Sequence, residues 1–297
     1  MTAPAAARSQ PLWLLVLLTV SWAIAWPVIK IGVSTVPPLW YACLRYAIAT
    51  VCLIAVVAAR RGIAWPSVGD RWLIGVSATL QMAIYSALTG LALTRLPPGR
   101  ASVLAFSTPL WVVPLAAWRL RERVTGRALA GVVLGLAGVL VIALPALRSD
   151  RAGARVAYGL LLGASAAWAV SIVYVRAHRF GAPALALAPW QTLVAATLLA
   201  PLAWTAEGRL PPIGWSGILS LAYVGPVGTA FAYWAVVEAG RHYPASTMAM
   251  ALLATPALGL TLSALTLGEP VDAPLLVSLV LVAVGIRLAT MVPLDKR

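Results

Sequence analysis

The feature that most constrains this chain is a set of landmark residues that occurs twice. The members of each pair stand 146 or 147 residues apart, and they are Trp22-Ala23 with Trp168-Ala169, Thr108-Pro109 with Thr255-Pro256, Glu122 with Glu269 and Gly138 with Gly285. Matched Trp and Pro residues at one spacing along the whole chain indicate that a single unit was duplicated. The fold must therefore accommodate two similar halves.

The composition indicates that both halves lie in a membrane. Hydrophobic residues make up 62% of the chain and charged residues only 10%, whereas soluble domains carry roughly 25% charged residues. A membrane-spanning helix needs about 20 apolar residues. Runs of this length predict helices over residues 12–31, 38–59, 71–93, 99–118, 127–145, 156–176, 183–203, 215–239, 245–266 and 273–291.

The resulting fold class is an all-α polytopic membrane protein of ten transmembrane helices. We expect one five-helix repeat over residues 1–147, a second over residues 156–297, and a short polar linker over residues 148–155. Because five is odd, the second repeat enters the bilayer from the opposite side. Inverted repeats are the construction that secondary transporters use for alternating access, so transport is the first hypothesis.

The basic residues are interpreted as topology signals. The chain has a net charge of +14, but its 22 Lys and Arg residues lie almost entirely between apolar runs. Cytoplasmic loops concentrate such residues, and the distribution predicts that both termini are cytoplasmic. Arg45 is assigned to the opposite side by the same rule. We expect a lipid bilayer as surroundings and no nucleic-acid partner.

These motifs together resemble a known family. Ten predicted helices in a five-helix inverted duplication, a Trp-Ala in each first helix, a Thr-Pro in each fourth and a Glu after it are similar to the drug/metabolite transporter (DMT) superfamily, and in particular to its EamA family. Within that family the chain looks most like YddG-type amino-acid exporters. The resemblance implies an inner-membrane exporter of aromatic and other neutral amino acids, or related metabolites, that is not an enzyme and needs no cofactor.

One polar stripe is a candidate for the substrate site. Ser77, Gln81, Tyr85 and Thr89 recur every four residues of the third predicted helix and share one face. An unpaired polar group in hydrocarbon is costly, so this face must meet other helices or a wet cavity. Both interpretations stay open, and Gln81 and Tyr85 are the residues we expect to bind substrate.

Aromatic residues near mid-depth complete that candidate site. Trp22 and Trp168 are equivalent in the two repeats, and Tyr233 lies on the helix that matches the one carrying Tyr85. An indole N–H in the middle of a span needs a partner or a hydrated space. The cavity-wall hypothesis competes with ordinary core packing.

Prolines inside the fourth helix of each half are candidates for gating. Pro109 and Pro256 each remove one helical hydrogen bond and are expected to kink the span. Such a kink is either a static bend or a moving hinge. No ionic residue is expected at mid-depth. We therefore expect helix termini and backbone dipoles near these prolines to bind the two charges of a zwitterionic amino acid.

The positions of the other polar residues narrow the function further. The acidic residues and both histidines fall at predicted helix ends or in loops. This pattern predicts no metal site, no catalytic residue and weak or no proton coupling. The alternatives left open are export of drugs or other metabolites, a passive channel, and a membrane enzyme that acts on lipid-linked substrates.

Glycines on the fifth helix bear on the oligomeric state. Gly131, Gly135 and Gly138 place small residues along one side, which lets another helix approach closely. Packing within one chain is favoured over a dimer face. We expect a monomer or a weak dimer.

Overall fold

The fold is described from a computed structural model of the chain. It covers residues 12–59, 65–122, 124–148, 152–178, 180–239, 242–243, 248 and 251–290. These ranges contain helices and connecting turns and no strand. The expected cytoplasmic termini and the middle of the linker lie outside them.

The first half follows the predicted spans closely. Its elements are α1 (Leu12–Val33), α2 (Pro38–Ala59), α3 (Val68–Ser77), η1 (Ala78–Ile84), α4 (Tyr85–Leu93), α5 (Pro98–Ala105), α6 (Thr108–Leu120) and α7 (Gly126–Arg148). The segments α3, η1 and α4 form one continuous span, and α5 and α6 together form the next.

The second half repeats this order. Its elements are α8 (Ala152–His178), α9 (Ala184–Glu207), α10 (Trp215–Tyr223), η2 (Val224–Phe231), α11 (Ala232–Ala239), α13 (Ala254–Leu267) and α14 (Ala273–Thr290). In the described ranges, eight helices are long and apolar enough to cross a membrane, and α13 and α14 are shorter apolar helices. The ninth predicted span, residues 245–266, begins outside the described residues.

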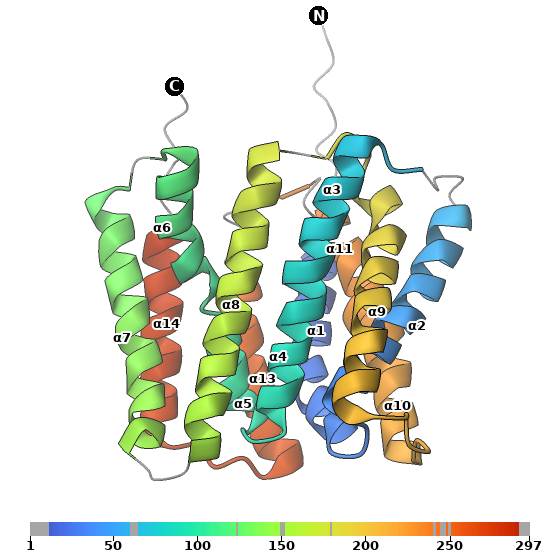
Figure 1. The fold of residues 1–297 in the computed structure, drawn as a ribbon. Coiled ribbons are helices and arrows are strands. Elements are labelled where there is room, and N and C mark those ends of the chain that lie inside the picture. Colours follow the sequence, from blue (N-terminus) through green and yellow to red (C-terminus); the bar gives the residue numbers. More distant parts are fainter. Residues whose placement is uncertain are drawn as a thin grey trace, which may run out of the picture.

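The two halves run in opposite directions and pack on each other. α1 descends and α8 ascends in Figure 1, and α1 begins at the same end of the bundle at which α14 finishes. The most extensive contacts join equivalent helices of the two halves, α7 with α14 and α2 with α9. The prediction of an all-helical, two-repeat architecture is confirmed.

Glycines permit the closest of these contacts. A Cβ atom built on Gly285 of α14 would lie 2.6 Å from the Gly135 nitrogen and 2.7 Å from the Gly131 oxygen of α7. Only a residue without a side chain allows the two backbones to approach this closely. The predicted packing role of these glycines within one chain is confirmed.

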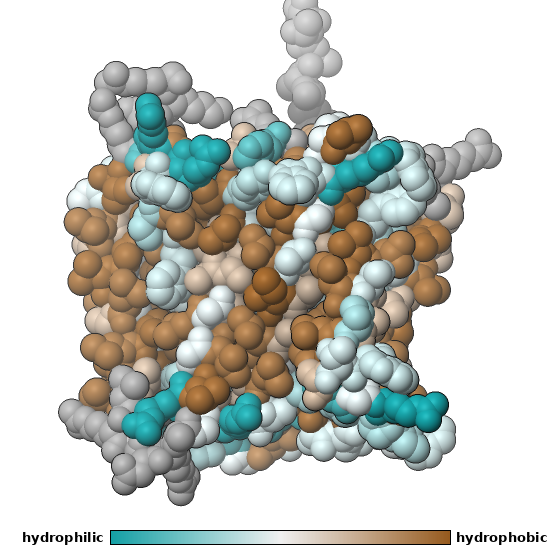
Figure 2. All heavy atoms as spheres, in the orientation of Figure 1, coloured by the Kyte–Doolittle hydropathy of each residue, from teal (hydrophilic) through white to brown (hydrophobic). Residues whose placement is uncertain are grey.

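The surface matches a bilayer environment. Figure 2 shows a broad apolar band between hydrophilic residues at the two ends of the bundle. Tryptophans lie exposed at helix ends, with Trp118 and Trp215 showing 79% and 78% of their surface. Such aromatic residues favour the interface between lipid and water.

The fourth helix of each half is broken rather than kinked, and this corrects the expectation for its prolines. α5 ends at Ala105, two turn residues follow, and α6 begins at Thr108. Pro109 therefore lies in the first turn of a new helix, where its missing N–H costs nothing. Pro256, the third residue of α13, also lies in a first helical turn.

A hydroxyl from the other half adds a hydrogen bond to backbone carbonyls at each break. Ser165 of α8 donates to the carbonyl oxygens of Leu104 at 2.9 Å and Ala105 at 3.2 Å. Thr19 of α1, which is equivalent to Ser165, donates to the carbonyl oxygen of Ala251 at 3.4 Å. The first helix of each half thus supports the broken helix of the other.

The third helix of each half contains a wider, π-helical segment. It is η1 in the first half and η2 in the second, and the Thr229 hydroxyl bonds the carbonyl oxygen of Val224, five residues earlier. The repeat register shifts by about four residues near 224–227, which is inside η2. π segments are rare and are frequently found at functional sites.

Candidate functional site

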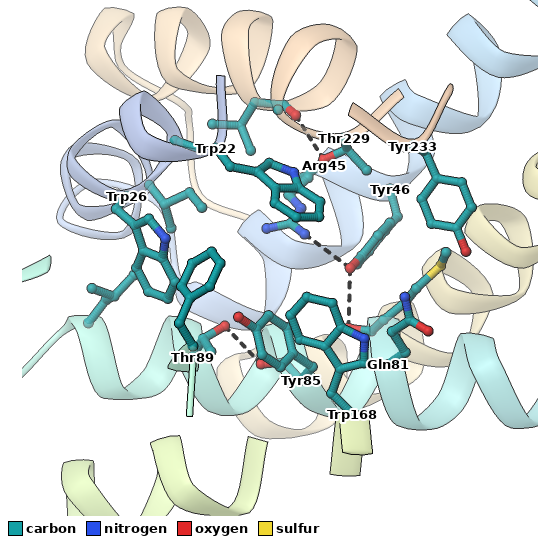
Figure 3. Close-up of a pocket in the computed structure, with 17 residues that line it drawn as sticks. Trp22, Trp26, Arg45, Tyr46, Gln81, Tyr85, Thr89, Trp168, Thr229 and Tyr233 are labelled. Carbon is teal, nitrogen blue, oxygen red and sulfur yellow. Dashed lines mark hydrogen bonds between the residues drawn. The ribbon is translucent and has the colours of Figure 1, made fainter. Parts of the chain in front are cut away.

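The described residues enclose a cavity of about 830 Å³, open space at its mouth included, to which both halves contribute. Figure 3 shows 17 residues that line it. The walls come from α1, α2, η1, α4, α8, η2, α11 and the turn between α5 and α6. The lining residues are Trp22, Ala25, Trp26, Ile29, Arg45, Tyr46, Gln81, Met82, Tyr85, Thr89, Leu93, Phe106, Trp168, Val224, Gly228, Thr229 and Tyr233.

Aromatic rings form one continuous wall of the cavity. The rings of Trp22 and Trp168 meet edge to face with centroids 6.4 Å apart, and Tyr85 meets Trp168 in the same way at 4.8 Å. Edge-to-face pairs fix the ring planes, which leaves flat faces available to a ligand. The structure brings together all five residues predicted to bind substrate, namely Trp22, Gln81, Tyr85, Trp168 and Tyr233. Their role in binding stays a prediction.

The polar stripe of the third helix is divided between two roles. Gln81, Tyr85 and Thr89 line the cavity. Ser77 does not, because it is buried and donates to the carbonyl oxygens of Leu73 and Ile74. Both interpretations left open by the sequence therefore apply, each to a different part of the stripe.

Neighbouring helices hold the polar side chains of the cavity in place. The Tyr233 hydroxyl donates to Gln191 Oε1 at 2.5 Å, and Ser171 donates to Gln81 Oε1 at 3.5 Å. Thr89 donates back to the carbonyl oxygen of Tyr85 at 2.8 Å. Because Gln81 takes part in its bond as an acceptor, its Nε2 donors remain available to a ligand.

Arg45 lies in the cavity wall, which the sequence analysis missed. Assigning it to topology was wrong, since it is well inside α2 and lines the cavity. Its Nη2 donates to the Tyr46 hydroxyl at 3.0 Å, and its guanidinium carbon is 4.8 Å from the Tyr46 ring centroid. Arg45 is therefore a charged residue inside a span that the sequence analysis did not consider as part of the site.

Tyr46 was not predicted either, although its hydroxyl connects α2, η1 and α4. Its hydroxyl accepts from Arg45, shares a 2.7 Å hydrogen bond with Ser86, and donates to the carbonyl oxygen of Met82 at 3.3 Å. The ring is 3% exposed. The adjacent Arg-Tyr in an otherwise apolar run was the signal that could have found both residues.

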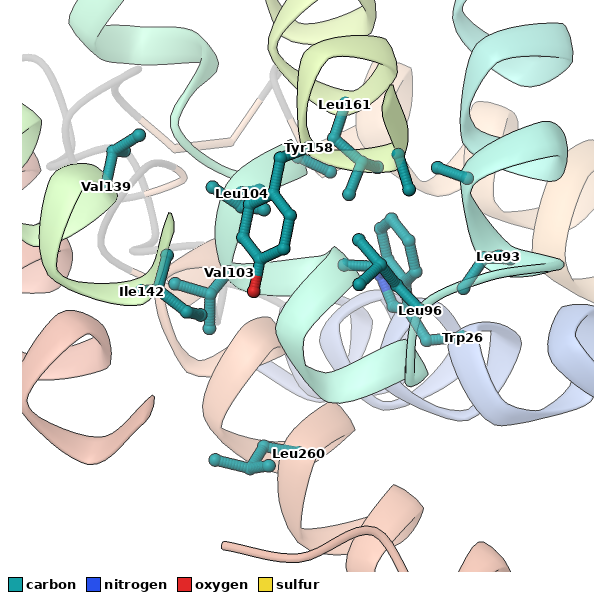
Figure 4. Packing of buried hydrophobic residues seen from close by; sticks show 14 of the residues in the cluster. Trp26, Leu93, Leu96, Val103, Leu104, Val139, Ile142, Tyr158, Leu161 and Leu260 are labelled. Carbon is teal, nitrogen blue, oxygen red and sulfur yellow. The ribbon is translucent and has the colours of Figure 1, made fainter. Parts of the chain in front are cut away.

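The cavity wall is continuous with the main apolar core. Trp26 lines the cavity and also belongs to the largest buried cluster, together with Leu93 and Leu96. Figure 4 shows these side chains beside Leu104 and Leu161. One wall of the site is thus held by the packing of the whole bundle.

Pro109 and Pro256 lie apart from the cavity lining. The turn before Pro109 contributes Phe106, but the nearby carbonyls are already bonded by Ser165. Nothing in this geometry assigns the charges of a ligand to the helix ends at these prolines. Their role as gates stays a prediction.

The parts of the chain that the structure describes contain no cluster of three or more His, Cys, Asp or Glu residues that could hold a metal ion. The described carboxylates act at helix ends instead. Glu269 accepts from the Gly99 nitrogen at 2.8 Å and the Arg100 nitrogen at 3.1 Å, and Asp272 accepts from the Leu275 nitrogen at 3.1 Å. Both carboxylates therefore cap the N-terminal ends of helices, in keeping with the predicted location of the acidic residues at helix ends.

Comparison with known proteins identifies the family. The sequence model of the EamA-like transporter family matches residues 10–144 and again residues 155–291. The chain belongs to the EamA-like transporter family. The two matches divide this EamA-like transporter in the same way as its landmark residues, and the family consists of transporters rather than enzymes.

Several relatives resemble this EamA-like transporter along most of its length. A probable amino-acid metabolite efflux pump of Escherichia coli (strain K12) is 28% identical over 284 residues, which is 92% of each chain. The aromatic amino acid exporter YddG of Ancylobacter novellus is 28% identical over 216 residues, covering 70% of this chain and 74% of the relative. A solved crystal structure aligns with a TM-score of 0.64 at 23% identity over 93% of this chain and 96% of that one. This last likeness supports the fold alone.

Proposed function

We propose that this protein exports amino acids, aromatic and other neutral ones in particular, or closely related small metabolites, by alternating access. The observation that carries the proposal is the cavity between the two inverted halves, with an aromatic wall built by Trp22, Tyr85 and Trp168. A largely apolar cavity with a few fixed polar groups is typical of small-molecule sites. The names of the Escherichia coli and Ancylobacter novellus relatives support amino acids as cargo.

The chemistry of the wall favours bulky neutral side chains. Aromatic faces and Met82 present apolar, polarisable surface, and Gln81 adds an amide that both donates and accepts. Few directional groups fix the shape of a side chain, so we expect broad specificity within this class. Drugs or other metabolites are the alternative cargo on the same scaffold.

Alternating access would proceed by movement of one half against the other. α1 packs on α13, and α8 packs on α5 and α6, so each first helix is tied to the broken helix of the opposite half. Inverted repeats allow the two sets of contacts to exchange around a fixed site. The helix breaks before Pro109 and Pro256 are the proposed hinges.

We propose a bacterial inner membrane as the location, with both termini in the cytoplasm. The rule of basic cytoplasmic loops supports this orientation. At the end of the bundle where α1 begins, α6 ends in Arg119 and Arg121. The proposed partners are the lipid bilayer and the small-molecule cargo, and the proposed assembly is a monomer or weak dimer.

The direct test is a flux assay with purified protein in liposomes and a panel of radiolabelled amino acids. We expect saturable flux of aromatic and other neutral amino acids. Trp168→Leu should reduce the flux of phenylalanine several-fold, up to about tenfold, since an aromatic pair contributes roughly 0.5–1.5 kcal/mol beyond its buried area. Trp118→Leu, an exposed tryptophan outside the cavity, is the matched control and should change it less than about twofold.

The same assay separates the alternatives. Flux that rises linearly with concentration would indicate a channel, and transport of drugs without any amino acid would assign the alternative cargo. The cavity lining among the described residues holds no Asp, Glu or His. An imposed pH gradient should therefore change flux only weakly.

A further inference from the structure

The strongest unassigned feature of the cavity is the charge of Arg45. The residue lies seven positions after the start of α2 at Pro38, about 10 Å along the helix axis. Figure 3 shows its guanidinium directed into the space between the aromatic side chains. An ionised group at this depth is costly to keep, so its presence in the cavity wall calls for a function.

No described carboxylate balances this charge. None of the ion pairs among the described residues includes Arg45. These pairs are Arg100 with Asp272, Arg176 with Glu122, and His242 with Glu238. The Arg45 Nε atom is buried and lacks a hydrogen-bond partner. Among the described residues, the single acceptor of the guanidinium is a neutral hydroxyl, that of Tyr46. A partly buried cation with an unbonded, buried Nε donor is destabilising unless a ligand completes its hydrogen bonds.

We propose that Arg45 binds the carboxylate of the transported molecule, which restricts the cargo to compounds that carry one carboxylate beside an apolar body. This inference rests on the proposed function and deepens it. A guanidinium presents a planar fork that matches a carboxylate through two parallel hydrogen bonds. The Nε atom that lacks a partner is one of the donors such a pair uses.

The rest of the cavity suits the remainder of such a molecule. The faces of Trp22, Tyr85 and Trp168 accept an apolar or aromatic body, and they attract an ammonium group through the ring quadrupole. The cavity lining in the described residues holds one full positive charge and no carboxylate. An amino acid is therefore bound through its acid end, and an amine that lacks the carboxylate meets an unfavourable like charge.

The test compares ligands that differ only at the carboxylate. Phenylalanine and phenylalaninamide share the side chain and the ammonium group, and 3-phenylpropionate keeps the carboxylate but has no ammonium. Binding is measured with purified protein in detergent by the ligand-dependent rise in melting temperature, and flux is measured in liposomes. The wild type should prefer phenylalanine over its amide by about tenfold or more, and it should also bind 3-phenylpropionate.

Variants at Arg45 locate the source of this preference. Arg45→Gln should bring the ratio of the affinities for phenylalanine and its amide close to one. Arg45→Lys should keep part of the preference, because lysine supplies a positive charge but not the planar fork. Arg45→Met keeps the apolar stem and is the second neutral variant if Arg45→Gln does not fold. Arg95→Gln, at an exposed arginine in the turn after α4, is the matched control and should keep the wild-type ratio.

Failure of this inference is distinguishable from failure of the proposed function. A wild-type ratio in a folded neutral variant, or equal binding of phenylalanine and its amide by the wild type, overturns the role of Arg45 even if amino acids are transported. Selective binding of carboxylates that is lost in the neutral variants, without flux of any amino acid, supports the role of Arg45. That outcome assigns a different carboxylate as cargo.

Discussion

Glu122 and Glu269 hold equivalent positions in the two halves, yet they have different partners. Glu269 is 6% exposed and accepts from two backbone nitrogens at the start of α5 and from Ser263. Glu122 lies at the opposite end of the bundle, is partly exposed, and forms a 2.6 Å ion pair with Arg176. The same residue type thus caps a buried helix at one end and joins two helices by charge at the other.

The basic partners differ in the same way. Lys30 and Arg176 are equivalent by sequence, but Lys30 donates to the carbonyl oxygens of Leu93 at 2.5 Å and Leu96 at 3.3 Å instead of pairing with Glu269. At one end of the bundle, Lys30 and Glu269 bind the ends of different helices. At the other end, Arg176 and Glu122 pair directly. Sequence symmetry therefore places equivalent charged residues at the two ends of the bundle, while the arrangement of the helices decides whether they pair. The proposed alternating access requires the two ends to exchange these patterns.

The largest expected effect comes from removing the buried carboxylate. Glu269→Ala leaves the nitrogens of Gly99 and Arg100 without their acceptor and should destabilise the protein by about 3 kcal/mol. Glu122→Ala removes a partly exposed pair and should cost about 1 kcal/mol or less. Unfolding of both variants in detergent, followed by circular dichroism, measures the difference. Equal losses would show that the two ends are energetically equivalent.

A smaller loss of stability is expected at the contact of Gly285 in α14 with Gly131 and Gly135 in α7. Gly285→Ala places a methyl group against the α7 backbone and should cost about 1–3 kcal/mol, because the helices must separate. Gly75→Ala is the control, since a Cβ there meets nothing within 4 Å, and it should be neutral or slightly stabilising. Melting temperatures of the two variants check this. A stable Gly285→Ala protein would contradict the contact between α7 and α14.

The smallest effect tests the two hydroxyls that support the broken helices. Ser165→Ala removes its bonds to the carbonyl oxygens of Leu104 and Ala105 and should cost about 0.6 kcal/mol, the average for hydrogen bonds between membrane helices. Thr19→Val removes one longer bond and should cost about half as much. The same unfolding assay measures both. A larger loss for Thr19→Val would reverse the order of the two halves.

The sequence predicted the spans and part of the cavity wall for physical reasons. Apolar runs of bilayer length give the helices directly, and repeat equivalence points to Trp22 and Trp168 because a duplicated fold places equivalent residues around one axis. Gln81 and Tyr85 followed from a polar stripe that hydrocarbon does not tolerate. These signals are local, or they relate positions by a fixed spacing.

The rest depended on contacts between distant residues. Glu269 caps a helix 170 residues away along the chain, and no local pattern indicates such a partner. Arg45 was assigned from charge alone, although its position inside α2 and the absence of an acidic residue nearby in the sequence distinguish it from a loop arginine. The helix breaks were missed because proline has the same sequence signature in a kink and in a first turn.

The wide segments η1 and η2 bear on how such a site diversifies in evolution. Each stands in the middle of a span and contributes cavity residues, Gln81 and Met82 from η1 and Gly228 and Thr229 from η2. In a helix each residue turns the chain by about 100°, so gaining or losing one residue in a wide turn rotates the following face. Proteins that share this fold can thereby present new side chains to their cargo without a change in the length of any loop.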